Sequence, residues 1–321
     1  MRVDAELDRA AKAIDAAGVV SLACHVSPDG DALGSLLALH LLCRSQGKES
    51  VAAWPSPAHV APHYRFLPGL EDTTPADQFP ARPELMVTFD CGSIDRLGRL
   101  TDAARAAGEL VVLDHHATNT CYGTINVVDA DAAATAVLVR RLAARLGWPL
   151  TRPAAECIYA GLVTDTGRFQ YSNTTPEVFA LAEELARFDL PIEHITRELF
   201  EKHRFAYLQL VADVLGRAVL EPGLALVSAA VTREDLDRHG VDVEETEGLI
   251  DLLRRTAEAT VVVLAKEAPE GVRVSLRSLA EVDVGALARA MGGGGHRFAS
   301  GFTHHGTVTE ALELVRAALS G

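Results

Sequence analysis

His25, Asp29 and Asp31 lie in the segment HVSPDGDALGS, which directly follows an apolar run and also contains Pro28 and Gly30. An imidazole and two carboxylates this close together belong either to a turn with a helix cap or to a metal site. Taken alone, Asp31 is explained as the N-cap of a helix that begins near residue 32. The other acidic residues of the chain decide between these two interpretations.

More acidic and imidazole side chains follow other regular segments. Asp90 ends LMVTFD, the triplet Asp114, His115 and His116 ends LVVLDHH, and Asp165 opens the loop expected after a helix. Each has an ordinary structural interpretation as a turn residue or a buried histidine. In an open parallel sheet, however, ligands bind outside the carboxyl ends of the strands. We therefore expect these side chains to gather at one rim of the sheet.

Aspartates gathered at one rim would repel one another, and the stretches HVSPDGDALGS, LMVTFD and LVVLDHH carry no matching Lys or Arg. Such crowding raises carboxylate pKa values and destabilises a fold unless a cation is present. Two divalent ions resolve the conflict, and mixed Asp and His ligation favours Mn²⁺, with Mg²⁺, Co²⁺ or Zn²⁺ as alternatives. A metal pair promotes in-line attack of hydroxide at phosphorus, so the expected reaction is hydrolysis of a phosphate ester.

The order of the regular segments predicts an α/β protein with two domains and a connector. Apolar strands alternate with helices in the first half, which indicates a parallel sheet with helices on both faces. A charged helical stretch follows, and then a smaller α/β domain with a mixed sheet. The predicted domains are 1–188, 189–220 for the helical connector, and 221–321. Strands are expected at 19–26, 50–55, 85–90, 110–116, 224–231, 260–267 and 272–278, and helices at 33–43, 95–107, 132–146, 153–163, 284–291 and 308–319.

The composition limits the partners of the chain. The net charge of −14 argues against binding to long DNA or RNA, because that affinity depends on a basic surface. The five cysteines form no C-x-x-C pair, which fits reduced thiols in a cytoplasmic protein. We find no signal peptide and no apolar run of about 20 residues, so no membrane association is expected.

These motifs resemble those of the DHH phosphoesterase superfamily, in order and over nearly the whole chain. HVSPDGDALGS, Asp90, the triplet DHH at 114–116 and Asp165 in LVTDTGRF resemble its four catalytic motifs. GGGGHRFASG, residues 292–301, resembles the signature of the DHH-associated C-terminal domain. Length, domain plan and the segment EETEGLIDLLRR are most similar to the group of bifunctional oligoribonucleases and 3′-phosphoadenosine 5′-phosphate phosphatases.

The resemblance implies roles for the individual residues. His116 would face the scissile phosphate, Asp114 would orient the histidine pair, and the active chain would be a homodimer. The two metal ions would share one ligand: His25, Asp29 and Asp90 would hold the first, and Asp31, Asp90, His115 and Asp165 the second.

The second domain is expected to bind the far end of a short substrate across an interdomain cleft. VRVSLRS, residues 272–278, alternates between apolar and polar positions, which predicts a half-buried strand. Arg277 and Ser278 match the arginine–serine pair with which the family grips substrate. The glycine run is either a flexible linker or an anion-binding loop. The resemblance favours the loop, with Gly293, Gly294, Gly295 and His296 in contact with substrate.

We therefore expect a Mn²⁺-dependent phosphodiesterase and phosphatase. It would hydrolyse short oligoribonucleotides, such as the dinucleotide pApA, to mononucleotides and convert 3′-phosphoadenosine 5′-phosphate to AMP. Cyclic di-AMP hydrolysis is one alternative. The other is a regulator that binds nucleotides without turnover, although such proteins usually lack a metal ligand and this sequence lacks none.

Overall fold

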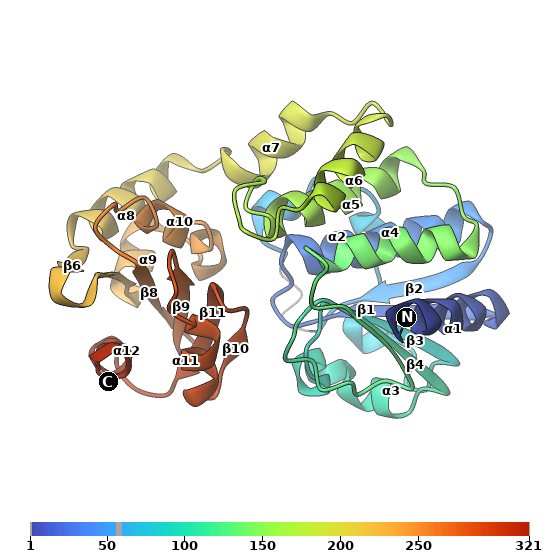
Figure 1. Ribbon diagram of the computed structural model, residues 1–321, viewed down its shortest axis with the longest axis horizontal. Coiled ribbons are helices and arrows are strands. Elements are labelled where there is room, and N and C mark those ends of the chain that lie inside the picture. The colour runs from blue at the N-terminus through green and yellow to red at the C-terminus, as the bar shows by residue number, and fades with distance from the viewer. Residues whose placement is uncertain (1, 56–59, 321) are drawn as a thin grey trace. The chain divides into compact units, whose positions relative to one another are not determined.

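The computed structural model describes residues 2–55 and 60–320, and the chain divides into two compact units, Met1–Leu199 and Phe200–Gly321. Figure 1 shows a sheet with flanking helices in each unit, which confirms the predicted α/β class. The predicted connector covers α7 (Ile192–Phe200) and α8 (Phe205–Gly216), and α8 packs inside the second unit. The predicted limits of the connector, residues 189 and 220, are not tested by this division and remain a prediction.

The first unit contains a parallel sheet that, within the described residues, has five strands in the order β2-β1-β3-β4-β5. Helices α2 and α4 lie on one face, and α3 packs with apolar side chains on the other (Figure 1). This arrangement places the carboxyl ends of the strands at one rim. The elements are β1 (Val19–Cys24), β2 (Glu49–Ala53), β3 (Leu85–Phe89), β4 (Glu109–Asp114), β5 (Ile125–Val128), α1 (Arg2–Ala16), α2 (Gly30–Ser45), α3 (Thr101–Arg105), α4 (Thr135–Leu146), α5 (Arg152–Asp165) and α6 (Pro176–Ala186).

The second unit contains a mixed sheet that, in the described part of the chain, runs β10-β11-β9-β8-β7-β6. Helices α8 and α10 pack on one face and α11 and α12 on the other. Only β7 and β8 pair in parallel within this described sheet. The elements are β6 (Val219–Glu221), β7 (Leu226–Val231), β8 (Val261–Ala268), β9 (Gly271–Ser278), β10 (Gly294–Gly295), β11 (Ala299–His304), α9 (Arg233–His239), α10 (Leu249–Leu253), α11 (Val284–Ala290) and α12 (Val308–Ser320).

Three details differ from the sequence predictions. The helix expected at 95–107 begins as a 3-10 stretch, Ile94–Leu100, because Gly98 takes a positive φ of 52° there, and it is α-helical only over Thr101–Arg105. Strands β5, β6 and β10 were not predicted because they have only four, three and two residues. The six-residue β11, ASGFTH, was missed because Phe302 is its one large apolar side chain. The glycine run is not a linker, because Gly294 and Gly295 pair with β11. None of the helices in the described ranges is long and apolar enough to cross a membrane.

Candidate metal centre

Asp90 lies at the middle of the site, one residue past β3. Its backbone turns sharply there, with a φ of 53°, and its N–H donates to the carbonyl oxygen of Leu113 at 3.0 Å. A positive φ is uncommon outside glycine, and such strain persists where surrounding structure imposes it. The turn directs a carboxylate that is only 2% exposed toward the rim of the sheet.

The loop after β1 supplies two further carboxylates at the start of α2. Asp29, rather than Asp31, is the N-cap of this helix, because its side chain accepts from the N–H of Ala32. Asp31 lies in the first turn and instead accepts from the N–H groups of Thr135 and Ala136, at 2.6 and 2.9 Å. The structural explanation for Asp31, an N-cap, is therefore wrong. Its carboxylate is held by the N-terminus of a different helix, α4.

Asp165 is the last residue of α5 and not the first of a loop. It comes near Asp31 because α2 and α5 pack very closely. A Cβ on Gly161 would lie 2.8 Å from Asp31 Oδ1, and one on Gly34 would lie 2.4 Å from the carbonyl oxygen of Cys157. Neither position has room for a larger side chain, so these glycines allow the approach that joins the two aspartates.

The carboxylates surround two histidine rings. His115 Nε2 lies 3.1 Å from Asp165, 3.4 Å from Asp90 and 3.8 Å from Asp31. His25 Nε2 lies 3.5 Å from Asp90 and 3.9 Å from Asp29. Among the described residues, two ligand groups around these rings share Asp90, one with His25 and Asp29 and one with Asp31 and His115. A third group joins Asp90 to Asp114 and His116, and in each group the ligand atoms lie within 4.8 Å of one another.

The orientation of both rings suits metal binding. His25 Nδ1 bonds the carbonyl oxygen of Val26 at 2.8 Å, and His115 Nδ1 bonds that of Ala132 at 3.2 Å. A carbonyl oxygen only accepts, so Nδ1 of His115 carries a proton. His25 Nδ1 also lies 3.2 Å from the guanidinium of Arg96, and in both rings Nε2 faces the carboxylates. Metal-bound histidines are commonly held in this way.

Without a cation, the protonation equilibria of this cluster are strongly perturbed. Burial raises the pKa of Asp31 well above its usual value, and the charges of Asp165 and Asp90 add to the effect. Burial would lower the pKa of His115, but Asp165 and Asp90 raise it well above its usual value. Burial would also raise the pKa of Asp90, but His116 and then His115 hold it well below its usual range. The donor set fits divalent cations, which would replace these shared protons.

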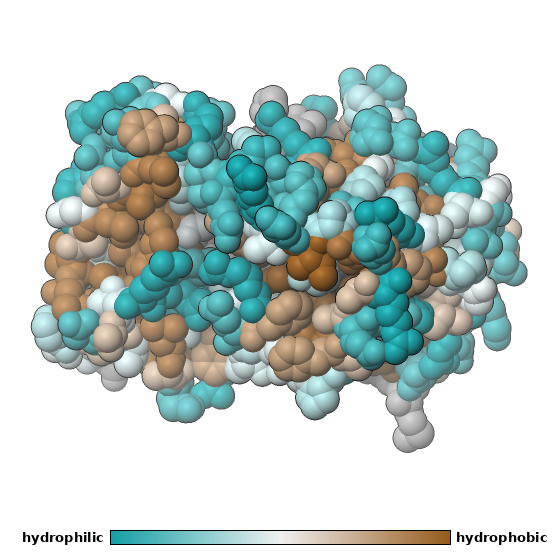
Figure 2. Space-filling model, turned by 90° about the horizontal axis from the view of Figure 1, so that it is seen from above, coloured by the Kyte–Doolittle hydropathy of each residue, from teal (hydrophilic) through white to brown (hydrophobic). Residues whose placement is uncertain are grey.

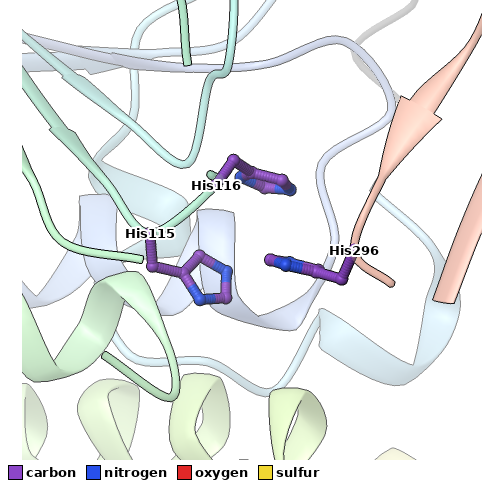
Figure 3. A group of neighbouring side chains, drawn as sticks. All are labelled: His115, His116 and His296. Carbon is purple, nitrogen blue, oxygen red and sulfur yellow. The ribbon is translucent and has the colours of Figure 1, made fainter. Parts of the chain in front are cut away.

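His116 lies beside His115, with ring centroids 5.0 Å apart (Figure 3). Its Nδ1 lies 2.7 Å from Asp114 Oδ1, and Asn119 donates from its amide to the other oxygen of Asp114 at 2.5 Å. Burial would lower the pKa of His116, whereas Asp90 and Asp114 raise it. The buried Asp114 carboxylate thus fixes the orientation of the His116 ring.

Two residues of this network were missed by the sequence analysis. Thr135 is completely buried and donates its hydroxyl to Asp90 Oδ1 at 2.9 Å. The amide nitrogen of Asn119 also donates to the carbonyl oxygen of Cys91, and its amide oxygen accepts from the N–H of Cys121. These two bonds orient the amide so that its nitrogen faces Asp114. Asn119 was within reach, because it lies only three residues after the DHH triplet, whereas Thr135 has no such signal.

The predicted substrate residues of the second unit lie on β9, on β10 and the residue just before it, and in the turn after β10. The alternation in β9 is confirmed, with Arg277 half-buried on the polar side. Ser278 is buried, and its hydroxyl donates to the carbonyl oxygen of Ala280. Gly293 has no room for a Cβ, which would lie 2.1 Å from the carbonyl oxygen of Gly301. His296 N–H donates to the carbonyl oxygen of Ala299 and closes the β10–β11 turn.

Comparisons with known proteins agree with this architecture. Residues 19–162 match the DHH family, N-terminal domain, and residues 224–321 match the DHHA1 domain. The bifunctional oligoribonuclease and PAP phosphatase NrnA of Thermus thermophilus is 33% identical over 100% of this chain and 94% of its own length. The chain belongs to the DHH family. The NrnA protein of Bacillus subtilis is 30% identical over 86% of each chain.

Solved structures of two other proteins share the fold. An exopolyphosphatase-related protein from Bacteroides fragilis superposes with a TM-score of 0.87, at 26% identity, over 99% of this chain and 96% of that one. The exonuclease RecJ from Thermus thermophilus, in complex with Mn²⁺, gives a TM-score of 0.55 at 16% identity over 98% of this chain and 55% of its own. The second likeness shows a common fold alone.

Proposed function

We propose that this DHH protein is a Mn²⁺-dependent hydrolase of short oligoribonucleotides and of 3′-phosphoadenosine 5′-phosphate. The sharing of Asp90 by two ligand groups carries this proposal, since it provides for two neighbouring ions. The NrnA relatives, which are named oligoribonuclease and PAP phosphatase, support the choice of substrates. The net charge of −14 favours a short substrate over a long polyanion.

In the proposed site, His25, Asp29 and Asp90 hold one ion, and Asp31, Asp90, His115 and Asp165 hold the other. When bound, such an ion pair neutralises phosphate charge and makes a water molecule acidic. Asp31 is presented by its bonds to α4, and Thr135 holds one oxygen of Asp90.

His116 is the proposed electrostatic stabiliser and proton donor. Asp90 and Asp114 raise the pKa of the ring against the effect of burial, and Asp114 accepts from Nδ1, so these carboxylates favour the positively charged form of His116. That charge would stabilise the phosphoryl oxygens, and the ring could then give a proton to the leaving oxygen. In the second unit, Arg277, Ser278, Gly293, Gly294, Gly295 and His296 are the proposed substrate contacts, with the hydroxyl of Ser278 shaping the turn after β9.

The test of this proposal compares substrates under controlled metal content. Metal-stripped protein is mixed with pApA, 3′-phosphoadenosine 5′-phosphate, cyclic di-AMP or a 24-mer RNA, with and without Mn²⁺, and products are separated by chromatography. We expect Mn²⁺-dependent release of AMP from the first two substrates and slow cleavage of the 24-mer. Preferred turnover of cyclic di-AMP would redirect the proposal to second-messenger control. If the protein binds nucleotides but turns over none of them with any metal ion, the proposed enzymatic activity is refuted and a regulatory role is favoured.

We also propose that the chain acts in the cytoplasm as a homodimer. Figure 2 shows hydrophobic side chains gathered on the second unit, at the left of the view. The exposed large hydrophobic residues of this unit include Phe205 and Leu208 of α8 and Val219 and Leu220 of β6. Strand β6 is also an edge of the sheet in the described residues, and exposed edges and apolar patches commonly mark protein–protein contacts.

A double substitution, Phe205→Glu with Leu208→Glu, tests this interface. These side chains are 74% and 51% exposed, so the charges should leave the fold of the unit intact. We expect the wild type to sediment at twice the chain mass at micromolar concentration and the variant at the chain mass. The matched control is Phe179→Glu on α6, where the replaced side chain is 57% exposed, and it should remain dimeric. A monomeric wild type, or a dimeric double variant, would contradict this interface.

A further inference from the structure

Lys266 of β8 is a buried cation that the proposed reaction does not use. It is 7% exposed, and it pairs in register with Arg273 of β9. Side chains alternate across a sheet, so Lys266 shares a face with Arg273, Ser275 and Arg277. This face is the polar side of β9, where the family resemblance places the substrate-binding Arg277.

The rest of this sheet face is only partly covered. Helices α8 and α10 pack their apolar side chains on β7 and β8, against residues such as Val262 and Leu264. The polar side of β9 stays half-exposed. The facing residues of β11, Ala299 and Gly301, lie opposite Arg277 and Ser275 and have little or no side chain. Lys266 therefore lies at the border between the covered strand β8 and an open strip, which consists of Arg273, Ser275 and Arg277 on the polar side of β9.

The three cations on this face differ in their partners. Arg273 is neutralised by Glu270 and, at 3.8 Å, by Glu244. Neither Lys266 nor Arg277 has a carboxylate within ion-pair distance among the residues that the structure describes. Among the described residues the side chain of Lys266 makes no hydrogen bond either. The guanidinium of Arg277 donates to the carbonyl oxygen of Leu276, and its buried Nε has no acceptor.

Burying a cation without a partner costs free energy, so such groups are retained mainly where a ligand completes them. Burial lowers the pKa of Lys266, and the charges of Arg273 and Arg277 lower it further, against the opposing effect of Glu247 and Glu244. An anion on the open strip would supply the missing counter-charge. In a chain with 44 acidic and 30 basic side chains, two unpaired cations on one sheet face are not explained by general surface charge.

We propose that Lys266 and Arg277 together bind one phosphate group, with the hydroxyl of Ser275 between them. The identification of this phosphate as part of a nucleotide rests on the proposed function. Lysine serves as a point charge toward phosphate and arginine as a planar fork, so the pair can hold a terminal phosphate from two sides. Lys266 is then a substrate-binding residue that no motif of the sequence indicated.

The test measures ligand binding to the full-length protein in EDTA, so that the metal centre takes no part. Calorimetry would compare AMP, adenosine and inorganic phosphate on wild type, Lys266→Met, Lys266→Arg and Arg273→Met. We expect Lys266→Met to weaken AMP binding about tenfold, the loss of one charge-assisted contact, with adenosine unaffected. Lys266→Arg should retain most of the affinity for AMP. Arg273→Met should bind AMP within about twofold of wild type, because glutamates already neutralise Arg273. Binding of inorganic phosphate as tight as that of AMP would mean that a free anion is the ligand, and would overturn the nucleotide assignment.

Two further measurements separate binding from structure. A lysine with only a structural role would lower the melting temperature on replacement, whereas Lys266→Met should leave it equal or higher, because an unpaired buried charge is removed. In the wild type, AMP should slow acetylation of Lys266 by acetic anhydride, measured by mass spectrometry of its peptide, and this holds whether or not a variant folds. Unchanged AMP affinity in Lys266→Met, or no protection by AMP, would overturn the inference. AMP binding that depends on Lys266 without Mn²⁺-dependent turnover would instead refute the proposed function and leave the phosphate site standing.

Discussion

Replacing Asp90 by alanine should abolish Mn²⁺-dependent hydrolysis of pApA. Asp90 contributes to both ligand groups, so its loss removes a ligand from each ion. Loss of an outer-sphere partner of a metal ligand typically costs about 10–100-fold in affinity or activity, and a shared ligand should exceed this range. We expect kcat/KM to fall at least ~100-fold at saturating Mn²⁺, and bound Mn²⁺ per chain to fall as well.

The matched control for this variant is Asp95→Ala. Asp95 lies on the same β3–α3 connection, and its side chain is 83% exposed and makes a 3.4 Å surface contact with Arg105. Exposed pairs contribute little, so activity and Mn²⁺ content should stay within about twofold of wild type. An Asp90→Ala protein that folds, binds two Mn²⁺ ions and retains activity would refute the bridging role.

The central part of the site was predictable because its residues end strands. Asp90 and His115 directly follow apolar runs that became β3 and β4, and parallel strands bring their ends together. Asp31 and Asp165 depended on a less visible feature. They meet because Gly34 and Gly161 allow α2 and α5 to pack closely, and a single sequence does not show which glycines face each other.

The supporting residues could not be predicted for a different reason. Thr135 is separated from Asp90 by 45 positions. A threonine at the start of a helix usually indicates only that a helix begins there. Lys266 stands in an apolar run that correctly predicted a strand, but its lack of a partner depends on β9 and on the helices beside it. Local pattern gives the element, whereas the partners of a buried polar group come from the tertiary structure.

Asp165→Asn should change stability in opposite directions with and without metal. Asp165 is crowded by other carboxylates, and burial raises its pKa, with the contact to His115 opposing this. A carboxyl with a raised folded-state pKa destabilises the fold once pH exceeds the unfolded value, and increasingly so as pH rises through the folded pKa. In EDTA at pH 7, the neutral amide should therefore raise the melting temperature. This advantage should shrink as the pH is lowered toward 5.

With Mn²⁺ the order should reverse. A ligand at 100 times its Kd stabilises the folded state by about 2.7 kcal/mol, and Asp165→Asn should lose most of this gain because one ion loses a ligand. Differential scanning fluorimetry in EDTA and in Mn²⁺ measures both effects, with the exposed Asp131→Asn as a control that should follow wild type in each. A variant that is less stable than wild type in EDTA would contradict carboxylate crowding, and an undiminished Mn²⁺ shift would remove Asp165 from the ligand set. The opposite signs separate a metal ligand from a residue that only packs, since loss of packing would lower stability under both conditions.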